Sequence, residues 1–247
     1  TFISRYNVFT HIFIHIFIHI IIFNKYNYLI KSIFLYILNN IMSYKKHIVD
    51  TMKKLYSKKY INVHDGNVSF KPKNEKFFYI SAGSIKKNGI TEDQVIKIGF
   101  KNPTSLFNNE IKQELFFEKN HKYHPSREIH MHSLLQTFQH NYNKDIFVIH
   151  AHPPNIINYI GLNKSNELRN IIDTFPEINV GKIGKNVKYY DAGSMDLATN
   201  CFFNLLNHDI IGLERHGSLS IGEDIDKVFE NIETLEYYTN IELESKY

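Results

Sequence analysis

The 247-residue chain has a single cysteine, Cys201, and only 4 arginines beside 25 lysines. One cysteine cannot form an intrachain disulfide, so a disulfide-rich scaffold and a cysteine-based zinc module are both excluded. We expect Cys201 to act as a small buried hydrophobic residue. A charge excess is also missing from residues 42–247, which hold 26 basic and 25 acidic residues. This balance leaves no excess of positive charge to bind nucleic acid or an anionic membrane, and we expect neither as a partner.

Residues 1–41 differ in composition from the rest of the chain. They contain no glycine, proline, alanine, aspartate or glutamate, and their apolar run from Val8 to Phe23 has 16 residues. A spanning helix needs roughly 20 apolar residues, so a membrane anchor is one weak interpretation. Three histidines spaced four apart in this run would share one face of a helix, so a metal-binding segment is a second interpretation. The first methionine is Met42, and we expect 1–41 to be a low-complexity extension and 42–247 to be the functional domain.

From residue 42 onward, alternating helix and strand signals predict one α/β domain. Asp65-Gly66-Asn67 is a turn signal before an alternating strand, and Ser126 is placed to cap a helix. The predicted strands are residues 68–70, 77–80, 94–100, 114–118, 145–150, 187–190 and 210–214. The predicted helices are residues 44–60, 126–138, 153–162, 196–206 and 224–238.

Histidines follow two of the predicted buried strands. In an extended strand, residues i and i+2 face the same side, so His150 and His152 can present both imidazoles to one metal ion. His216 follows the strand 210–214 in the same way. Three neutral imidazoles with an open fourth position are typical of a catalytic zinc site. A His-x-His pair alone is weak evidence, but two buried strands that end in histidine favour a metal centre.

An acidic residue accompanies these histidines on the predicted helix 126–138. Glu128 and His132 are four residues apart and share a helical face, whereas His130 points elsewhere and is expected to be a packing or surface residue. His132 is either a structural histidine that orients Glu128 or a more active group. Glu128 also suits a plain surface position, because a helix N-terminus favours an acid. Spacing alone leaves these alternatives open.

The order of the motifs resembles the class II aldolase/adducin family over residues 44–240, and in particular its fuculose-phosphate-type sugar-phosphate aldolases. The motifs are Asp65-Gly66-Asn67-Val68-Ser69, Ile80-Ser81-Ala82-Gly83, Pro125-Ser126-Arg127-Glu128 with His132, His150-Ala151-His152, and His216-Gly217 followed by Gly222 and a helix with Glu233 and Glu236. The resemblance implies a three-layer α/β/α fold with a mixed, largely antiparallel central sheet. It also implies a cytoplasmic homotetramer with active sites between subunits.

The resemblance further implies a chemistry. His150, His152 and His216 would hold one zinc ion per subunit, and Glu128 would be its fourth, displaceable ligand and the acid/base. The enzyme would cleave or form a C–C bond in a ketose phosphate, or a related hydroxy-ketone, through a metal-stabilised enediolate. Three imidazoles bind other divalent metals as well, so the residues favour zinc without fixing it.

The resemblance places Asn67, Gly83 and Ser126 in a phosphate pocket. Two positions depart from the family pattern. Ala82 lacks the hydroxyl that a threonine or serine would offer to a phosphate oxygen, and Ser81 or Ser84 is the alternative source of it. Arg127 stands where the family has a second serine. Because Arg pairs bidentately with phosphate or carboxylate, Arg127 is a further candidate for binding an anion.

Other reactions on the same scaffold stay open at this point. A related epimerase typically has Asp where this chain has Glu128, and a related dehydratase places its acid/base later, where Glu177 is the one visible candidate. Decarboxylase-like relatives would suit the Arg127 substitution. A non-catalytic interaction module like the adducin head predicts loss of the three metal histidines, and all three are present here.

Overall fold

The computed structural model describes residues 44–104, 114–117, 122–162 and 166–245. The predicted extension at residues 1–41 lies outside the described residues, and its separation from the functional domain stays a prediction. Among the described residues, no helix is both long enough and apolar enough to cross a membrane.

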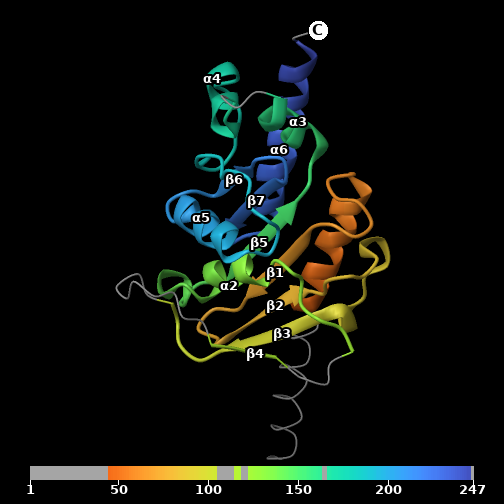
Figure 1. Ribbon diagram of the computed structural model, residues 1–247, viewed down its shortest axis with the longest axis vertical. Coiled ribbons are helices and arrows are strands. Elements are labelled where there is room, and N and C mark those ends of the chain that lie inside the picture. Colours follow the sequence, from red (N-terminus) through yellow and green to blue (C-terminus); the bar gives the residue numbers. More distant parts are fainter. Residues whose placement is uncertain (1–43, 105–113, 118–121, 163–165, 246–247) are drawn as a thin grey trace, which may run out of the picture. The chain divides into compact units, whose positions relative to one another are not determined.

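Seven strands form a single sheet within the described residues, in the order β4-β3-β2-β1-β5-β7-β6 (Figure 1). Every neighbouring pair of these strands is antiparallel. Parallel pairing occurs only as isolated bridges in this part of the chain, such as those of Ile183 with Ile210 and Val187 with Leu213. The expected largely antiparallel sheet is therefore confirmed. The strands are β1 (Asn67–Lys71), β2 (Phe77–Ser81), β3 (Val95–Phe100), β4 (Leu115–Phe117), β5 (Ile146–Ala151), β6 (Ile210–Leu213) and β7 (Gly217–Gly222).

Helices cover both faces of the sheet, and the central strand β5 is apolar on both sides. Along β5, Phe147 and Ile149 belong to one core cluster, whereas Ile146 and Val148 belong to the other, as strand alternation requires. The first core includes the helix at residues 44–57 together with α3 (Pro154–Leu162) and α6 (Ile225–Glu244). The second core includes α2 (Ile129–Thr137) and α5 (Met195–Leu205). The three-layer α/β/α expectation is confirmed.

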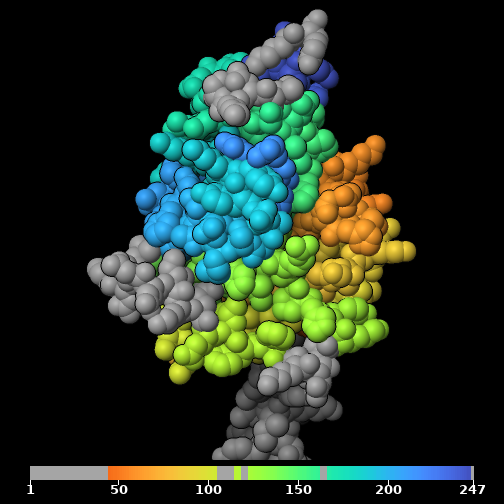
Figure 2. Space-filling model, in the orientation of Figure 1, coloured from red at the N-terminus to blue at the C-terminus, as the bar shows by residue number. Residues whose placement is uncertain are grey.

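The second helical layer is visible from outside in Figure 2, where the light-blue segment of α5 adjoins the lime-green segment of α2. Phe138, which follows α2, packs edge-on against Phe202 of α5 with ring centroids 5.1 Å apart. Cys201 lies in this core with no solvent exposure, as the sequence predicted. Its thiol is a packing group rather than a metal ligand.

Two local predictions were wrong, and two elements were missed. The helix predicted from Ser126 begins at Ile129, because residues 127 and 128 form a turn in which the Ser126 hydroxyl accepts the Glu128 N–H. The strand predicted at 187–190 is reduced to the single bridge at Val187. Strand β7 was not predicted, because a short serine- and glycine-rich segment carries little strand signal. The short helix α4 (Ile171–Thr174) was also missed.

Candidate active site

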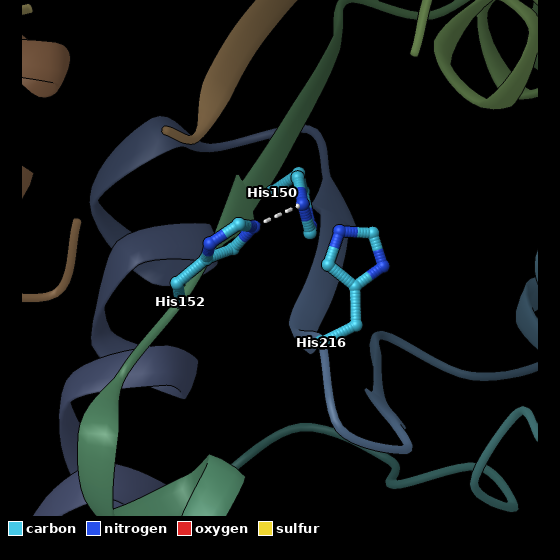
Figure 3. A group of neighbouring side chains, drawn as sticks. All are labelled: His150, His152 and His216. Carbon is cyan, nitrogen blue, oxygen red and sulfur yellow. Dashed lines mark hydrogen bonds between the residues drawn. The ribbon is translucent and has the colours of Figure 1, made fainter. Parts of the chain in front are cut away.

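The three predicted histidines converge at one end of the central strands (Figure 3). His150 lies near the end of β5, His152 just beyond it, and His216 in the turn between β6 and β7. One ligand nitrogen from each ring lies within 4.8 Å of the others. Gly217 allows this approach, because a Cβ there would lie 2.1 Å from the Ala151 carbonyl oxygen. The chain can therefore bring the His216 turn against the end of β5 only with glycine at this position.

Hydrogen bonds fix which ring nitrogens face the centre of the cluster. His150 Nδ1 lies 2.9 Å from the Ser218 carbonyl oxygen, which can only accept, so Nδ1 carries the proton. His152 Nδ1 faces the Asp65 carboxylate at 3.5 Å, which favours the same tautomer. When both rings are neutral, the two Nε2 atoms carry the lone pairs, and they lie 2.9 Å apart. Both rings thus present lone pairs toward one point.

Glu128 closes the cluster from a different part of the chain. It is the N-cap residue of α2, but its side chain makes no capping hydrogen bond. Instead, Oε2 lies 3.1 Å from His150 Nε2, and Oε1 lies 3.2 Å from His216 Nε2. The carboxylate is 9% exposed. Glu128 is therefore adjacent to two of the three metal candidates, His150 and His216, and a surface role for it is excluded.

Asn67 links Glu128 to a buried polar network. Asn67 is the first residue of β1 and pairs directly with His150 across the β1–β5 register. Its Nδ2 donates to Glu128 Oε2 at 2.9 Å, and its Oδ1 hydrogen-bonds to His132 Nε2. His132 Nδ1 bonds in turn to the Ser69 hydroxyl at 2.7 Å. His132 thus orients Glu128 through Asn67, which agrees with the structural alternative for this histidine.

Burial and charge shift the ionisation of these groups. Burial raises the pKa of Glu128, but electrostatic attraction to His150 and His216, 3.1 and 3.2 Å from its oxygens, outweighs it and holds that pKa well below its usual range. Burial lowers the pKa of His150, and Glu128 reverses this shift, so the pKa is raised. Burial, followed by the effect of neighbouring positive charge, lowers the pKa of His132 and of His152 to about 3. Both of these rings are neutral at physiological pH.

The donor set fits a divalent metal ion. Lone pairs of two imidazoles and the Glu128 carboxylate face one another, an arrangement that needs a positive charge at its centre. Among the described residues, Glu128 Oε1 is buried and has no hydrogen-bond donor. Neutral histidines whose second nitrogen bonds a carbonyl or carboxylate are the usual ligands of zinc. His150, His152 and His216 are therefore the residues that could hold a metal, with Glu128 beside them.

A cavity of about 430 Å³ opens beside the histidines. The predicted residues that line it are Asn67, Gly83, Ser126, Arg127, Glu128, His152 and His216. His150, which has no solvent exposure, lies behind this lining. Ser126 accepts hydrogen bonds from Asn67 Nδ2 and the Glu128 N–H, so its own hydroxyl proton is available to a ligand. The Gly83 N–H is already bonded to the His124 carbonyl oxygen.

Sequence reasoning missed two charged residues that line the same cavity, Asp65 and Lys87. Asp65 was visible only as part of a turn, although its place beside the glycine that precedes Asn67 was a usable signal. Lys87 follows another lysine in a polar segment, and nothing in its local pattern indicates burial. Only the tertiary structure brings it to the site.

The matching family model describes the class II aldolase and adducin N-terminal domain, and it covers residues 46–243. The chain belongs to this family. The expectation drawn from the motifs is confirmed, and with it an aldolase-type enzyme family in which the three histidines form the candidate metal site.

Curated relatives carry a more specific name. The chain is 29% identical over 206 residues to the L-fuculose phosphate aldolase of Methanocaldococcus jannaschii, which covers 81% of this chain and 95% of that protein. It is 31% identical over 185 residues to the L-fuculose phosphate aldolase of Methanococcus maripaludis strain C5, with 74% and 86% covered.

Solved structures share the fold. A sugar-phosphate aldolase from Thermotoga maritima superposes with a TM-score of 0.63 at 17% identity, over 85% of this chain and 95% of that one. An L-fuculose 1-phosphate aldolase gives a TM-score of 0.61 at 20% identity, over 83% and 86%. At these identities the likeness establishes the fold alone.

Proposed function

We propose that this chain is a zinc-dependent class II aldolase that cleaves or forms a C–C bond in a ketose phosphate or a related hydroxy-ketone. The observation that carries the proposal is the convergence of His150, His152, His216 and Glu128 beside one cavity. The names of the curated relatives, which are fuculose phosphate aldolases, support a sugar phosphate as the substrate class.

In this proposal the three histidines hold the metal through unprotonated nitrogens. When bound, the metal supplies a Lewis acid that polarises the oxygens of a hydroxy-ketone and stabilises the negative charge that develops there. The hydrogen bond from His150 Nδ1 to Ser218 holds the ring in the orientation that ligation needs. Asp65 does the same for His152.

Glu128 is the proposed acid/base, and its two oxygens have different surroundings. Oε2 accepts a hydrogen bond from Asn67 Nδ2, whereas Oε1 has no donor among the described residues. Oε1 is therefore the atom that takes the proton from the carbon next to the substrate carbonyl. Asn67 holds the carboxylate in place during this transfer, and His132 holds Asn67.

Metal analysis combined with a substrate screen tests the proposal. We expect about one zinc per chain in the purified protein and its loss in His150→Ala, because one of three ligands is removed. The zinc-loaded protein should then cleave at least one of a set of ketose phosphates. A folded protein that binds no metal at this site would overturn the proposal and favour the adducin-like interaction module.

The substitution Glu128→Gln separates metal binding from catalysis. The three histidines remain, so we expect bound zinc to be kept, whereas loss of the base should lower kcat by about 10²- to 10⁴-fold. Glu177→Gln is the matched control, because Glu177 is exposed and does not line the cavity. Full activity in Glu128→Gln would remove this residue from the mechanism. Loss of activity in Glu177→Gln instead would favour the dehydratase alternative.

The assembly and location expected from the resemblance remain proposals. A homotetramer would place the cavity near a subunit boundary, and sedimentation of the purified protein would measure the assembly directly. A cytoplasmic location is likewise a prediction, which fractionation of native cells would test. Products of the ketose phosphate reaction would distinguish an aldolase from an epimerase or decarboxylase on the same scaffold.

A further inference from the structure

Lys87 is a charged residue in the interior of the domain. It begins the short 3-10 helix Lys87–Gly89 and is only 1% exposed. Its backbone N–H donates to the Val63 carbonyl oxygen, and its side chain turns back so that Nζ donates to the Ala82 carbonyl oxygen at 2.5 Å. The side chain thus runs beneath the segment that follows β2.

The Lys87 ammonium makes few contacts with the described residues. Within the described part of the chain it forms no ion pair, and the Ala82 carbonyl is its one hydrogen-bond acceptor, although an ammonium has three N–H donors. Burial lowers its pKa to about 8, and Asp65 and Glu128 act in the opposite direction, so the group is still charged at neutral pH. A buried charge without a partner is costly, which favours a partner supplied from outside the chain.

The cavity offers the place for that partner. Lys87 lines it together with Gly83, Ser126 and Arg127. The hydroxyl groups near this position differ in their access to the cavity. Ala82 has none, and the Ser81 hydroxyl is fully buried and accepts the Val68 N–H at 3.3 Å. Ser84 also lines the cavity, but it is an exposed residue, whereas Lys87 is buried there. The cavity lining therefore includes a lysine, bonded to the Ala82 carbonyl, close to the position where the family pattern offers a hydroxyl.

We propose that Lys87 is a specificity-determining residue that binds the phosphate group of the substrate and replaces the hydroxyl missing at Ala82. This inference rests on the proposed function and names its anion-binding residue. Two N–H donors of Lys87 and the free proton of the Ser126 hydroxyl converge on the phosphate oxygens, and the exposed Arg127 guanidinium covers them from the rim. The phosphate in turn supplies the negative charge that the buried ammonium lacks.

Binding of inorganic phosphate to the zinc-loaded full-length protein tests this role without any turnover. Lys87→Met is compared with Lys86→Met, which removes the same charge from an exposed position one residue earlier. By calorimetry near neutral pH and at constant ionic strength, we expect Lys87→Met to weaken phosphate binding at least about tenfold. Lys86→Met should bind phosphate as the unmodified protein does. Equal affinities in the two variants would overturn the proposal.

A kinetic comparison adds a second readout. Lys87→Met should raise KM at least about tenfold for the ketose phosphate that the enzyme cleaves, with no such change for the unphosphorylated hydroxy-ketone. An equal loss with both substrates, or a loss of stability with unchanged phosphate affinity, would show that Lys87 only ties down the Ala82 carbonyl. Lys87→Gln repeats both measurements if the Met variant does not fold. The protein could also bind phosphate through Lys87 and show no aldolase activity. That result would support the phosphate site and reject the proposed reaction.

Discussion

Two lysine side chains are buried among the described residues, and their ammonium groups have different partners. Lys71 Nζ donates to three carbonyl oxygens, those of Pro72, Tyr142 and Lys144, at 2.7 to 3.1 Å. Lys87 Nζ donates to one carbonyl and lines a cavity. All three donors of Lys71 are therefore used inside the protein, so it has a structural role. Lys87 retains donors for a ligand.

Lys71 makes the free energy of unfolding of the domain change with pH in the alkaline range. Burial lowers its folded-state pKa from 10.5 to about 8. Between these values the unfolded chain binds a proton that the folded chain has lost, so the free energy of unfolding rises with pH. We expect this contribution to be absent from Lys71→Met. Urea unfolding at several pH values between 8 and 10.5 should show the unmodified protein gaining stability relative to the variant.

The control for this measurement is Lys73→Met, two residues further along the chain and exposed. Its pH dependence should follow that of the unmodified protein. A stability difference between the unmodified protein and Lys71→Met that stays constant over the whole range would contradict the assignment.

At the scale of elements, a side chain of α6 contacts the start of α3, the helix that follows the candidate metal ligands His150 and His152. The buried Glu236 carboxylate accepts hydrogen bonds from the Ile156 N–H at 2.9 Å and from both the N–H and the side-chain amide of Asn155. Asn155 and Ile156 lie in the first turn of α3, whose N–H groups have no partners within the helix. A carboxylate there also interacts favourably with the helix dipole. Glu236 thus fixes the start of α3, which follows His152 almost directly.

Removing this contact should destabilise the domain. We expect Glu236→Ala to lower the free energy of unfolding by about 2–3 kcal/mol, because buried N–H groups lose a charged acceptor. Glu233→Ala is the matched control on the same helix, since Glu233 forms a partly exposed ion pair with Lys58 at 2.7 Å. Such a pair contributes about 0–1 kcal/mol. Similar losses in the two variants, measured by urea unfolding, would argue against the proposed role of Glu236.

At the scale of the whole molecule, the candidate metal ligands tie together distant parts of the chain. Glu128 precedes α2, His150 and His152 end β5, and His216 lies between β6 and β7. A metal that binds only the folded arrangement stabilises it by mass action, by about 2.7 kcal/mol when free metal is 100-fold above Kd. We therefore expect a chelator to lower Tm and added zinc to restore it.

His150→Ala supplies the control for metal removal, since its Tm should respond little to chelator or to zinc. Thermal unfolding followed by circular dichroism would measure both proteins. The prediction is contradicted if the unmodified protein loses its zinc on chelation and its Tm does not change. Metal binding would then not contribute to folding stability.

Patterns of short period were readable in the sequence. The turn at Asp65-Gly66-Asn67, the strand β1 that follows it, and the i, i+2 relation of His150 and His152 are all local. The candidate site residues were found because their motifs follow one another in a family order. Strand β7 and the exact start of α2 were not found, since serine-rich segments and single turns leave weak local signals.

The sequence by itself determined the fold family, the histidine set and the acidic residue beside it, because periodicity and motif order are properties of neighbouring residues. Only the tertiary structure decided that Asn67 stands opposite His150, that Glu236 caps α3 and that Lys87 is buried beside the cavity. Each of these facts depends on strand register or on packing between residues far apart in the chain. No local sequence pattern predicts such contacts, because a lysine or asparagine on an exposed loop can have the same sequence neighbours.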